Sequence, residues 1–133
     1  MDEQDRITLS QYRLSRAEEM LMIARRDAEA QNYASANNRA YYCIFHTMRA
    51  VLALDGEDFK RHSAVISRFS QNYLKTRVFS GDYGKIIRDA FLIRNRSDYE
   101  DFYICSIADT EKLISNAAAF YEDVRAYLEK RYH

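Results

Sequence analysis

Helix breakers are scarce in this sequence of 133 residues, which contains no proline and only three glycines. Because proline interrupts a helix and glycine weakens it, their scarcity favours an all-α fold. The chain also carries no net charge, since 20 basic residues balance 20 acidic ones. Overall charge is therefore excluded as a means of attracting nucleic acid, although a local basic patch remains compatible with the sequence. No run of about 18 apolar residues occurs, so we expect no membrane-spanning segment.

Cysteine is scarce as well, with two residues, Cys43 and Cys105. They lie far apart and show neither a CxxC pattern nor another spacing typical of metal ligands, so we expect free thiols in a reducing cytosol. The acidic first residues lack the apolar segment of a secretory signal, which agrees with a cytoplasmic location. Residues 81–85 contain two glycines but lack the spacing of a phosphate-binding loop. We therefore expect neither a metal nor another cofactor.

Apolar residues that recur every three or four positions predict four long helices and one short one. The expected helices cover residues 7–30, 33–54, 64–74, 83–97 and 107–131. Asn32 and Ser63 are expected to cap the second and the third helix. Residues 98–105 fit a turn as well as a continued helix. We predict an all-α, antiparallel bundle of four to five helices, forming a single domain over residues 1–133 with its core over about 9–128.

One stripe of the fourth predicted helix mixes apolar and charged residues. At about 100° per residue, the stripe consists of Ile87, Phe91, Arg94 and Asp98, and the opposite side of Lys85, Asp89 and Arg96. Arg94 thus continues an inward-facing row, whereas Arg96 belongs to a solvated face. Since an unpaired charge at the end of a buried row is costly, Arg94 and Asp98 need partners or a ligand. We interpret this corner as the functional site.

The second predicted helix is mostly apolar but has one narrow polar arc. At about 100° per residue, Arg39, Tyr42, His46 and Arg49 fall within roughly 80° of one another. Two cations, an imidazole and a phenol together suit an anion, such as a phosphate of RNA or of a nucleotide.

The same residues also have structural explanations. An ion pair between Arg39 and Asp98, across two packed helices, would fix their register without any ligand. His46 fits a packed histidine better than a general base. His62, which lies beside Ser63 in a basic loop, fits a ligand contact better.

Three blocks of this sequence carry a resemblance to a known family: residues 38–45, residues 62–69, and residues 94–99 with the pattern Arg-x-x-x-Asp-Tyr. In their order and spacing, the chain resembles the HEPN superfamily, in its branch of small stand-alone proteins catalogued as UPF0332. The resemblance implies an antiparallel helical bundle, commonly a homodimer with a cleft between subunits. Many HEPN proteins are metal-independent ribonucleases, and some are toxins inhibited by a minimal nucleotidyltransferase encoded beside them.

The ribonuclease motif of that family, Arg-x4-6-His, is incomplete here. Arg94 matches the arginine, which is thought to stabilise charge on the phosphate. With four to six residues in between, the position of the histidine would be Tyr99, Glu100 or Asp101, so the histidine that acts as acid or base is missing. Unperturbed tyrosine is a poor base at neutral pH, because its pKa lies near 10. This departure favours binding over cleavage.

We therefore carry three hypotheses forward. The first is a HEPN-type RNA- or nucleotide-binding protein, the toxin-like component of a two-gene module with a minimal nucleotidyltransferase. The second is a metal-independent endoribonuclease with a composite arginine and histidine site. The third is a non-enzymatic, dimeric interaction module. The candidate catalytic residues are Arg94, Asp98 and His46, and the candidate ligand-binding residues are Arg39, Tyr42, His62, Ser63 and Tyr99.

Overall fold

The computed structural model describes residues 1–101 and 103–133, and in these residues every element of regular structure is helical. The elements are α1 (Glu3–Glu29), α2 (Tyr33–Leu54), α3 (His62–Phe69), a π-helical turn η1 (Ser70–Leu74), α4 (Tyr83–Tyr99) and α5 (Ile107–Tyr132). The predicted all-α class is confirmed. Within the part of the chain that the structure describes, no helix has the length and apolarity required to cross a membrane.

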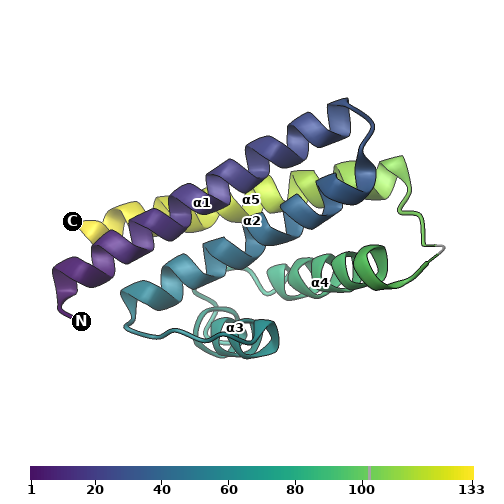
Figure 1. Cartoon of the computed structure of the whole chain (residues 1–133). Coiled ribbons are helices and arrows are strands. Elements are labelled where there is room, and N and C mark those ends of the chain that lie inside the picture. Colours follow the sequence, from purple (N-terminus) through teal and green to yellow (C-terminus); the bar gives the residue numbers. More distant parts are fainter. Residues whose placement is uncertain (102) are drawn as a thin grey trace.

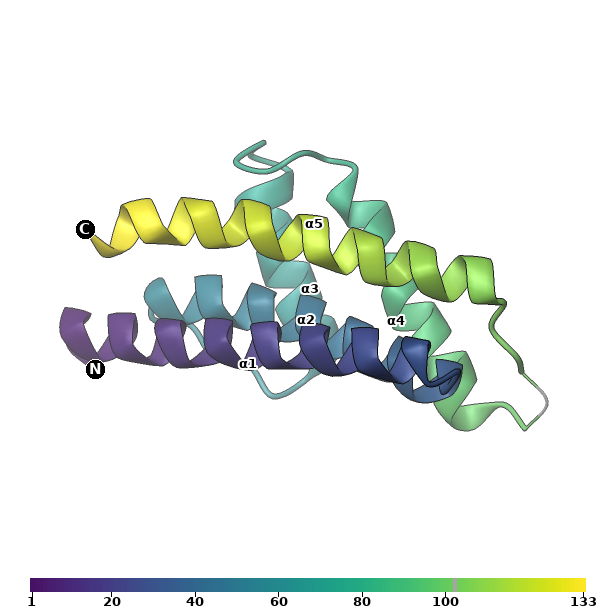
Figure 2. The same cartoon turned by 90° about the horizontal axis from the view of Figure 1, so that it is seen from above.

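Three long helices run along the molecule, and two shorter ones cross them. α1 runs antiparallel to α2 and α5, and the N and C ends lie at the same end of the molecule (Figure 1). α3 and α4 cross the long helices on one side, at steep angles that are visible in the second view (Figure 2). α2 packs against each of the other four α-helices, so it is the central element.

The central place of α2 follows from its sequence. Its large apolar side chains occur all around the helix except for the polar arc, and such a helix is stable only when it is surrounded by others. Tyr41, Ile44, Met48 and Leu52 are at most 1% exposed. They pack with Phe69 of α3 and Phe120 of α5 in one continuous core.

Two helices begin earlier than predicted, and one predicted cap makes no hydrogen bond. Asp2 accepts a hydrogen bond from the backbone N–H of Asp5 at 2.8 Å, so α1 begins at Glu3 and not at residue 7. Asn32 does occupy the position before α2, but its side chain makes no capping hydrogen bond. The prediction that Ser63 caps the third helix is wrong, because α3 already begins at His62.

The ambiguous stretch at residues 98–105 divides between helix and loop. α4 continues to Tyr99, and Glu100 is extended. Position 102 lies outside the described residues. α5 begins after Ser106, whose hydroxyl accepts from the backbone N–H of Asp109 at 3.0 Å. The helical ending matters for function, since it places Asp98 one turn after Arg94.

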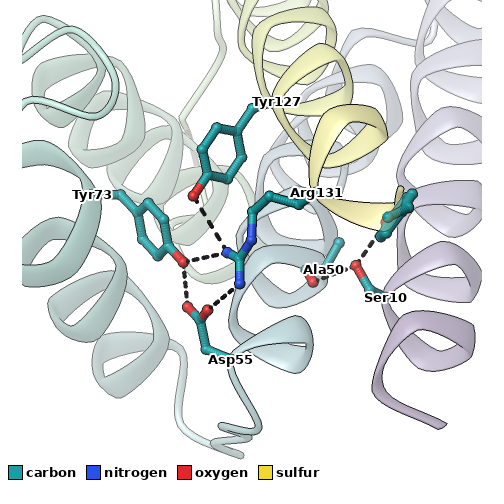
Figure 3. A network of polar contacts seen from close by, with 7 residues as sticks. Ser10, Ala50, Asp55, Tyr73, Tyr127 and Arg131 are labelled. Atoms are coloured by element: carbon teal, nitrogen blue, oxygen red, sulfur yellow. Dashed lines mark hydrogen bonds and ion pairs between the residues drawn. The ribbon is translucent and has the colours of Figure 1, made fainter. Parts of the chain in front are cut away.

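A polar network closes the end of the bundle where α2 and α5 finish (Figure 3). Arg131 donates to a carboxylate oxygen of Asp55 at 3.0 Å and to the hydroxyl of Tyr73 at 3.0 Å. The Tyr73 hydroxyl donates in turn to Asp55. Nearby, the buried hydroxyl of Ser10 donates to the carbonyl of Ala50 at 2.7 Å. These contacts join α1, α2, η1 and α5 at this end of the bundle.

Both cysteines are free and buried. Cys43 lies in the core of α2, and burial raises the pKa of its thiol to about 12. Since the thiolate is the reactive form, Cys43 is chemically inert at neutral pH.

Candidate functional site

Arg94 lies near the C-terminal end of α4 and faces α2, as its position in the inward row predicts. Its side chain is 16% exposed, and its Nε forms an ion pair with Asp98 at 3.0 Å. Its Nη2 donates to the hydroxyl of Tyr42 at 3.2 Å, and its Nη1 donates to the side-chain oxygen of Asn95 at 3.1 Å. The guanidinium therefore shares its surroundings with a carboxylate and with the second helix, in agreement with the sequence-based expectation.

Three tyrosines surround the same guanidinium. Its central carbon lies 5.8 Å from the ring of Tyr41, 5.6 Å from that of Tyr42 and 5.7 Å from that of Tyr99. A cation at such distances from aromatic rings is attracted to them, and planar arginine is better suited to this than lysine. Tyr99 is 74% exposed, so its ring lies at the surface beside Arg94. We call the site formed by Arg94, Asp98, Tyr41, Tyr42 and Tyr99 the Arg94 corner.

The predicted pair of Arg39 and Asp98 is wrong. Asp98 instead pairs with Arg94 on its own helix, and it accepts a hydrogen bond from the Asn38 side chain at 3.4 Å. Arg39 turns toward α1, where its Nη1 lies 3.9 Å from the sulfur of Met20. The reason is rotation along α2: successive residues differ by about 100°, so when Asn38 faces α4, Arg39 faces α1.

His62 is the histidine that the fold brings to the Arg94 corner. Its Nδ1 lies 2.8 Å from the hydroxyl of Tyr41, and its ring stacks on Phe45 with 4.2 Å between centroids. Burial lowers the pKa of His62, and the positive charges of Arg94 and Arg49 lower it further. The neutral form of the imidazole is therefore favoured at pH 7. The imidazole contacts the hydroxyl of Tyr41, and the ring of Tyr41 faces Arg94.

His46 belongs to a different neighbourhood, although its ring lies 5.9 Å from that of Tyr42. Burial lowers the pKa of His46 to about 4, with further contributions from Arg16, Arg49 and Arg13. Its charged neighbours thus come from α1 and from the end of α2, and Arg94 is not among them. The structure places His46 and Arg39 on the α1 side of the polar arc, apart from Arg94 and Asp98.

Ser63 lies next to His62, but it lines a separate groove. This groove, with a cavity volume of about 320 Å³, runs between α3 and α4 and is almost entirely apolar. Its lining consists of Ser63, Ile66, Ser67, Arg88, Phe91 and Leu92. Since Phe91 precedes Arg94 by one helical turn, the groove adjoins the Arg94 corner without including it.

Two contributors to the corner were missed from the sequence. Tyr41 was assigned to the apolar sector of α2, and it is indeed fully buried, yet its hydroxyl meets His62 and its ring faces Arg94. Asn38 lies one turn before Tyr42, and that spacing was the available signal for its contact with Asp98. In the described residues, no group of three or more His, Cys, Asp or Glu is placed to hold a metal ion.

Comparisons with known proteins agree with this architecture. A family model described as HEPN domain matches residues 10–127. A UPF0332 protein of Thermotoga maritima is 28% identical over 129 residues, which cover 97% of this chain and 96% of the relative. Two proteins of Methanocaldococcus jannaschii are also similar. "Putative toxin MJ0605" is 30% identical over 86% of this chain and 84% of its own length, and "Putative toxin MJ0142" is 24% identical over 86% and 78%. The chain belongs to the HEPN domain family.

Proposed function

We propose that this protein binds single-stranded RNA at the Arg94 corner, with a backbone phosphate on Arg94 and a base against Tyr99. The observation that carries the proposal is the guanidinium of Arg94, which is 16% exposed and is held between tyrosine rings beside an exposed aromatic wall. Arginine recognises phosphate with two parallel hydrogen bonds, and exposed aromatic rings stack on unpaired bases. The contacts with Tyr42 and Asn95 fix the orientation of the guanidinium before any ligand arrives.

The partner of Arg94 sets a condition on this proposal. Asp98 neutralises Arg94 at 3.0 Å, so a phosphate must compete with a carboxylate on the same helix. The side chain of Asp98 is 30% exposed, so it can turn toward solvent. A phosphate that takes its place would keep the charge of the largely buried Arg94 compensated.

We also propose the biological setting that the relatives suggest. Two similar proteins have names that include the word toxin, which supports a toxin-like role for this chain. In that role its partner would be a minimal nucleotidyltransferase encoded beside it, and both proteins would act in the reducing cytosol. The free, buried thiols of Cys43 and Cys105 suit such a compartment.

A homodimer is part of the same proposal, and the outer face of α4 supports it. Leu92 is 56% exposed and borders two grooves, of about 260 and 320 Å³, on either side of α4. Along this face the charges alternate, with Lys85 and Asp89 on one side of Leu92 and Arg96 on the other. In an antiparallel contact between two copies of α4, Asp89 of each copy would lie opposite Arg96 of the other.

RNA cleavage is a second candidate function, favoured by the position of His62. If its Nδ1 carries the proton and donates to Tyr41, then Nε2 has a free lone pair and can accept the proton of a ribose 2′-hydroxyl. The low pKa of His62, caused first by burial and then by Arg94, keeps the imidazole in this basic form at neutral pH. His62 would then serve as base in place of the histidine absent after Arg94.

The function is tested with Arg94→Lys and a fluorescein-labelled single-stranded RNA. We expect binding to weaken about tenfold, because lysine keeps the charge but loses the planar, bidentate fork. Fluorescence anisotropy measures the dissociation constant, and a denaturing gel of the same samples reports cleavage. The control is Arg96→Lys, an equal change on the solvated face, which should bind RNA like the wild type. A wild-type protein that retains no RNA, or an Arg94→Lys variant with unchanged affinity, would refute the proposal.

A further inference from the structure

A cluster of two arginines and one aspartate lies at the other end of the polar arc. Arg49 of α2 donates to a carboxylate oxygen of Asp58 at 2.7 Å, and Arg13 of α1 approaches the same oxygen at 3.2 Å. Asp58 belongs to the loop that joins α2 to α3 (Figure 1). One carboxylate therefore sits between two cations, which leaves an excess of one positive charge.

The arrangement is costly for a purely structural contact. Arg13 is only 8% exposed, and its Nη1 also donates to the carbonyl of Arg49 at 3.4 Å, so the two like charges are held close together. The buried Nε of Arg49 has no hydrogen-bond partner among the described residues. Burial and the neighbouring Arg49 both lower the pKa of Arg13.

Other contacts, which do not involve Asp58, also hold this loop in place. The backbone N–H of Glu57 donates to the carbonyl of Leu52 at 2.8 Å, and the Glu57 carboxylate pairs with Arg68 of α3 at 3.3 Å. The Asp58 side chain is 57% exposed, so it can turn into water without displacing these contacts. The need to hold the loop in place therefore does not explain why two arginines contact this carboxylate.

We propose that Arg13 and Arg49 form a second phosphate subsite, which receives a backbone phosphate of RNA and which the Asp58 carboxylate occupies in the free protein. This inference rests on the proposed RNA binding at Arg94. Arginine pairs presenting several N–H groups suit a phosphate better than a single carboxylate oxygen, because a phosphate offers more acceptor oxygens at higher charge.

The two subsites are connected through a row of side chains in contact. The guanidinium of Arg49 lies 5.7 Å from the ring of Phe45, and Phe45 stacks on His62 at 4.2 Å. His62 in turn meets the hydroxyl of Tyr41, whose ring faces Arg94. Tyr41 and Phe45 are buried, at 0% and 4% exposed, so they support this row from beneath. A single strand bound at both subsites would cross the row at His62, which is half-buried.

The test compares Asp58→Asn with the wild type, using the same fluorescein-labelled single-stranded RNA over a range of salt concentrations. Removal of the competing carboxylate should tighten binding about threefold to tenfold and steepen the salt dependence by about 0.7, the value for one further phosphate contact on a single strand. Adding Arg49→Gln to Asp58→Asn should cancel both gains. The matched control is Glu122→Gln, which removes an exposed carboxylate held by Arg125 at 3.1 Å on α5.

The outcomes separate this inference from the function on which it rests. If RNA binds through Arg94 but Asp58→Asn behaves like Glu122→Gln, the second subsite is refuted and the first stands. If Asp58→Asn instead lowers the melting temperature and binds RNA no better, Asp58 only stabilises the folded loop and the inference fails. If the wild-type protein retains no RNA, both proposals fall.

Discussion

Burial, and then arginines from three helices, lower the pKa of the two internal histidines. Arg13 and Arg16 reach His46 from α1, Arg49 reaches both histidines from α2, and Arg94 reaches His62 from α4. Each imidazole is partly buried, and burial is the largest cause of its lowered pKa. Burial, together with the neighbouring cations, thus favours the neutral form of both histidines, which leaves their nitrogen atoms available for hydrogen bonding.

The pKa of His46, lowered to about 4, predicts how stability depends on pH. In the unfolded chain a histidine takes up a proton near pH 6.5, whereas folded His46 does not until about pH 4. The stabilisation by neutral His46 is therefore present above pH 6.5 and is lost as the pH falls toward 4. After allowance for solvent exposure, we expect a loss of about 1 kcal/mol.

Urea unfolding of the wild type and of His46→Gln at pH 7 and pH 5 measures this effect. The unfolding midpoint of the wild type should fall more between the two pH values than that of His46→Gln. His133→Gln, at the exposed end of α5, should behave like the wild type. Equal pH sensitivity in all three proteins would mean that His46 gains its proton as easily in the folded state as in the unfolded one.

For single residues, the sequence predicted which way a side chain faces better than which residue it contacts. The buried row of α4 predicted that Arg94 faces α2, because helical periodicity fixes the direction of a side chain relative to its own helix. It could not predict that Asn38 and not Arg39 would face Asp98, since that depends on the rotation of α2 between α1 and α4. The contacts of Asp58 could not be predicted from the sequence, because a loop residue has no periodicity from which to infer its neighbours.

Among the helices, α2 determines the arrangement of the others. Its polar arc is divided between two neighbours: Tyr42 contributes to the contact with α4, and Arg39 and His46 face α1. α2 ends in a turn at Gly56, where φ is +80°, a conformation that residues with a Cβ atom adopt at a cost. The turn directs the chain into the loop that carries Asp58.

The turn after α2 gives a prediction for Gly56→Ala. An added Cβ would lie 3.2 Å from Cζ of Arg6, and the left-handed φ strains any alanine there. We expect a loss of about 1 kcal/mol in the free energy of unfolding, measured by chemical denaturation. Gly81→Ala is the control: its Cβ would meet no atom within 4 Å, and its φ is not left-handed. A Gly56→Ala variant as stable as Gly81→Ala would contradict the strain.

The helices themselves were predictable to within a few residues, because apolar periodicity and the scarcity of proline and glycine both act over long stretches. Their ends depend on single hydrogen bonds. The side chain of Asp2 starts α1 early, whereas Asn32 precedes α2 without capping it. The π-helical turn η1 within the predicted third helix has no signal in the periodicity.

For the molecule as a whole, the crossing of α3 and α4 over the long helices separates two ends with different roles. The network around Arg131 closes one end, beside the N and C ends of the chain (Figures 1 and 3). α4 finishes toward the opposite end (Figure 1), and with it lie the Arg94 corner and the exposed side chains of Tyr99 and Leu92. Assembly through α4 would therefore bring two Arg94 corners near one another.

The proposed dimer predicts the effect of charge reversal on α4. Asp89→Arg should weaken association at least fivefold, because it places two arginines opposite each other across the contact. Combining Asp89→Arg with Arg96→Asp restores opposite charges and should recover association, as measured by sedimentation equilibrium. Glu111→Arg, an equal reversal at an exposed position of α5, should leave it unchanged. A double variant that associates no better than Asp89→Arg alone would exclude this face.

The burial of both native thiols has a practical consequence. Cys43 is fully enclosed and Cys105 is 8% exposed, so neither offers an open surface to a maleimide dye. A cysteine introduced at an exposed position, such as Ser63 on the rim of the apolar groove, would then be labelled selectively in an otherwise unaltered chain. A fluorophore at that position would lie next to His62, and its emission would change when a strand binds across His62.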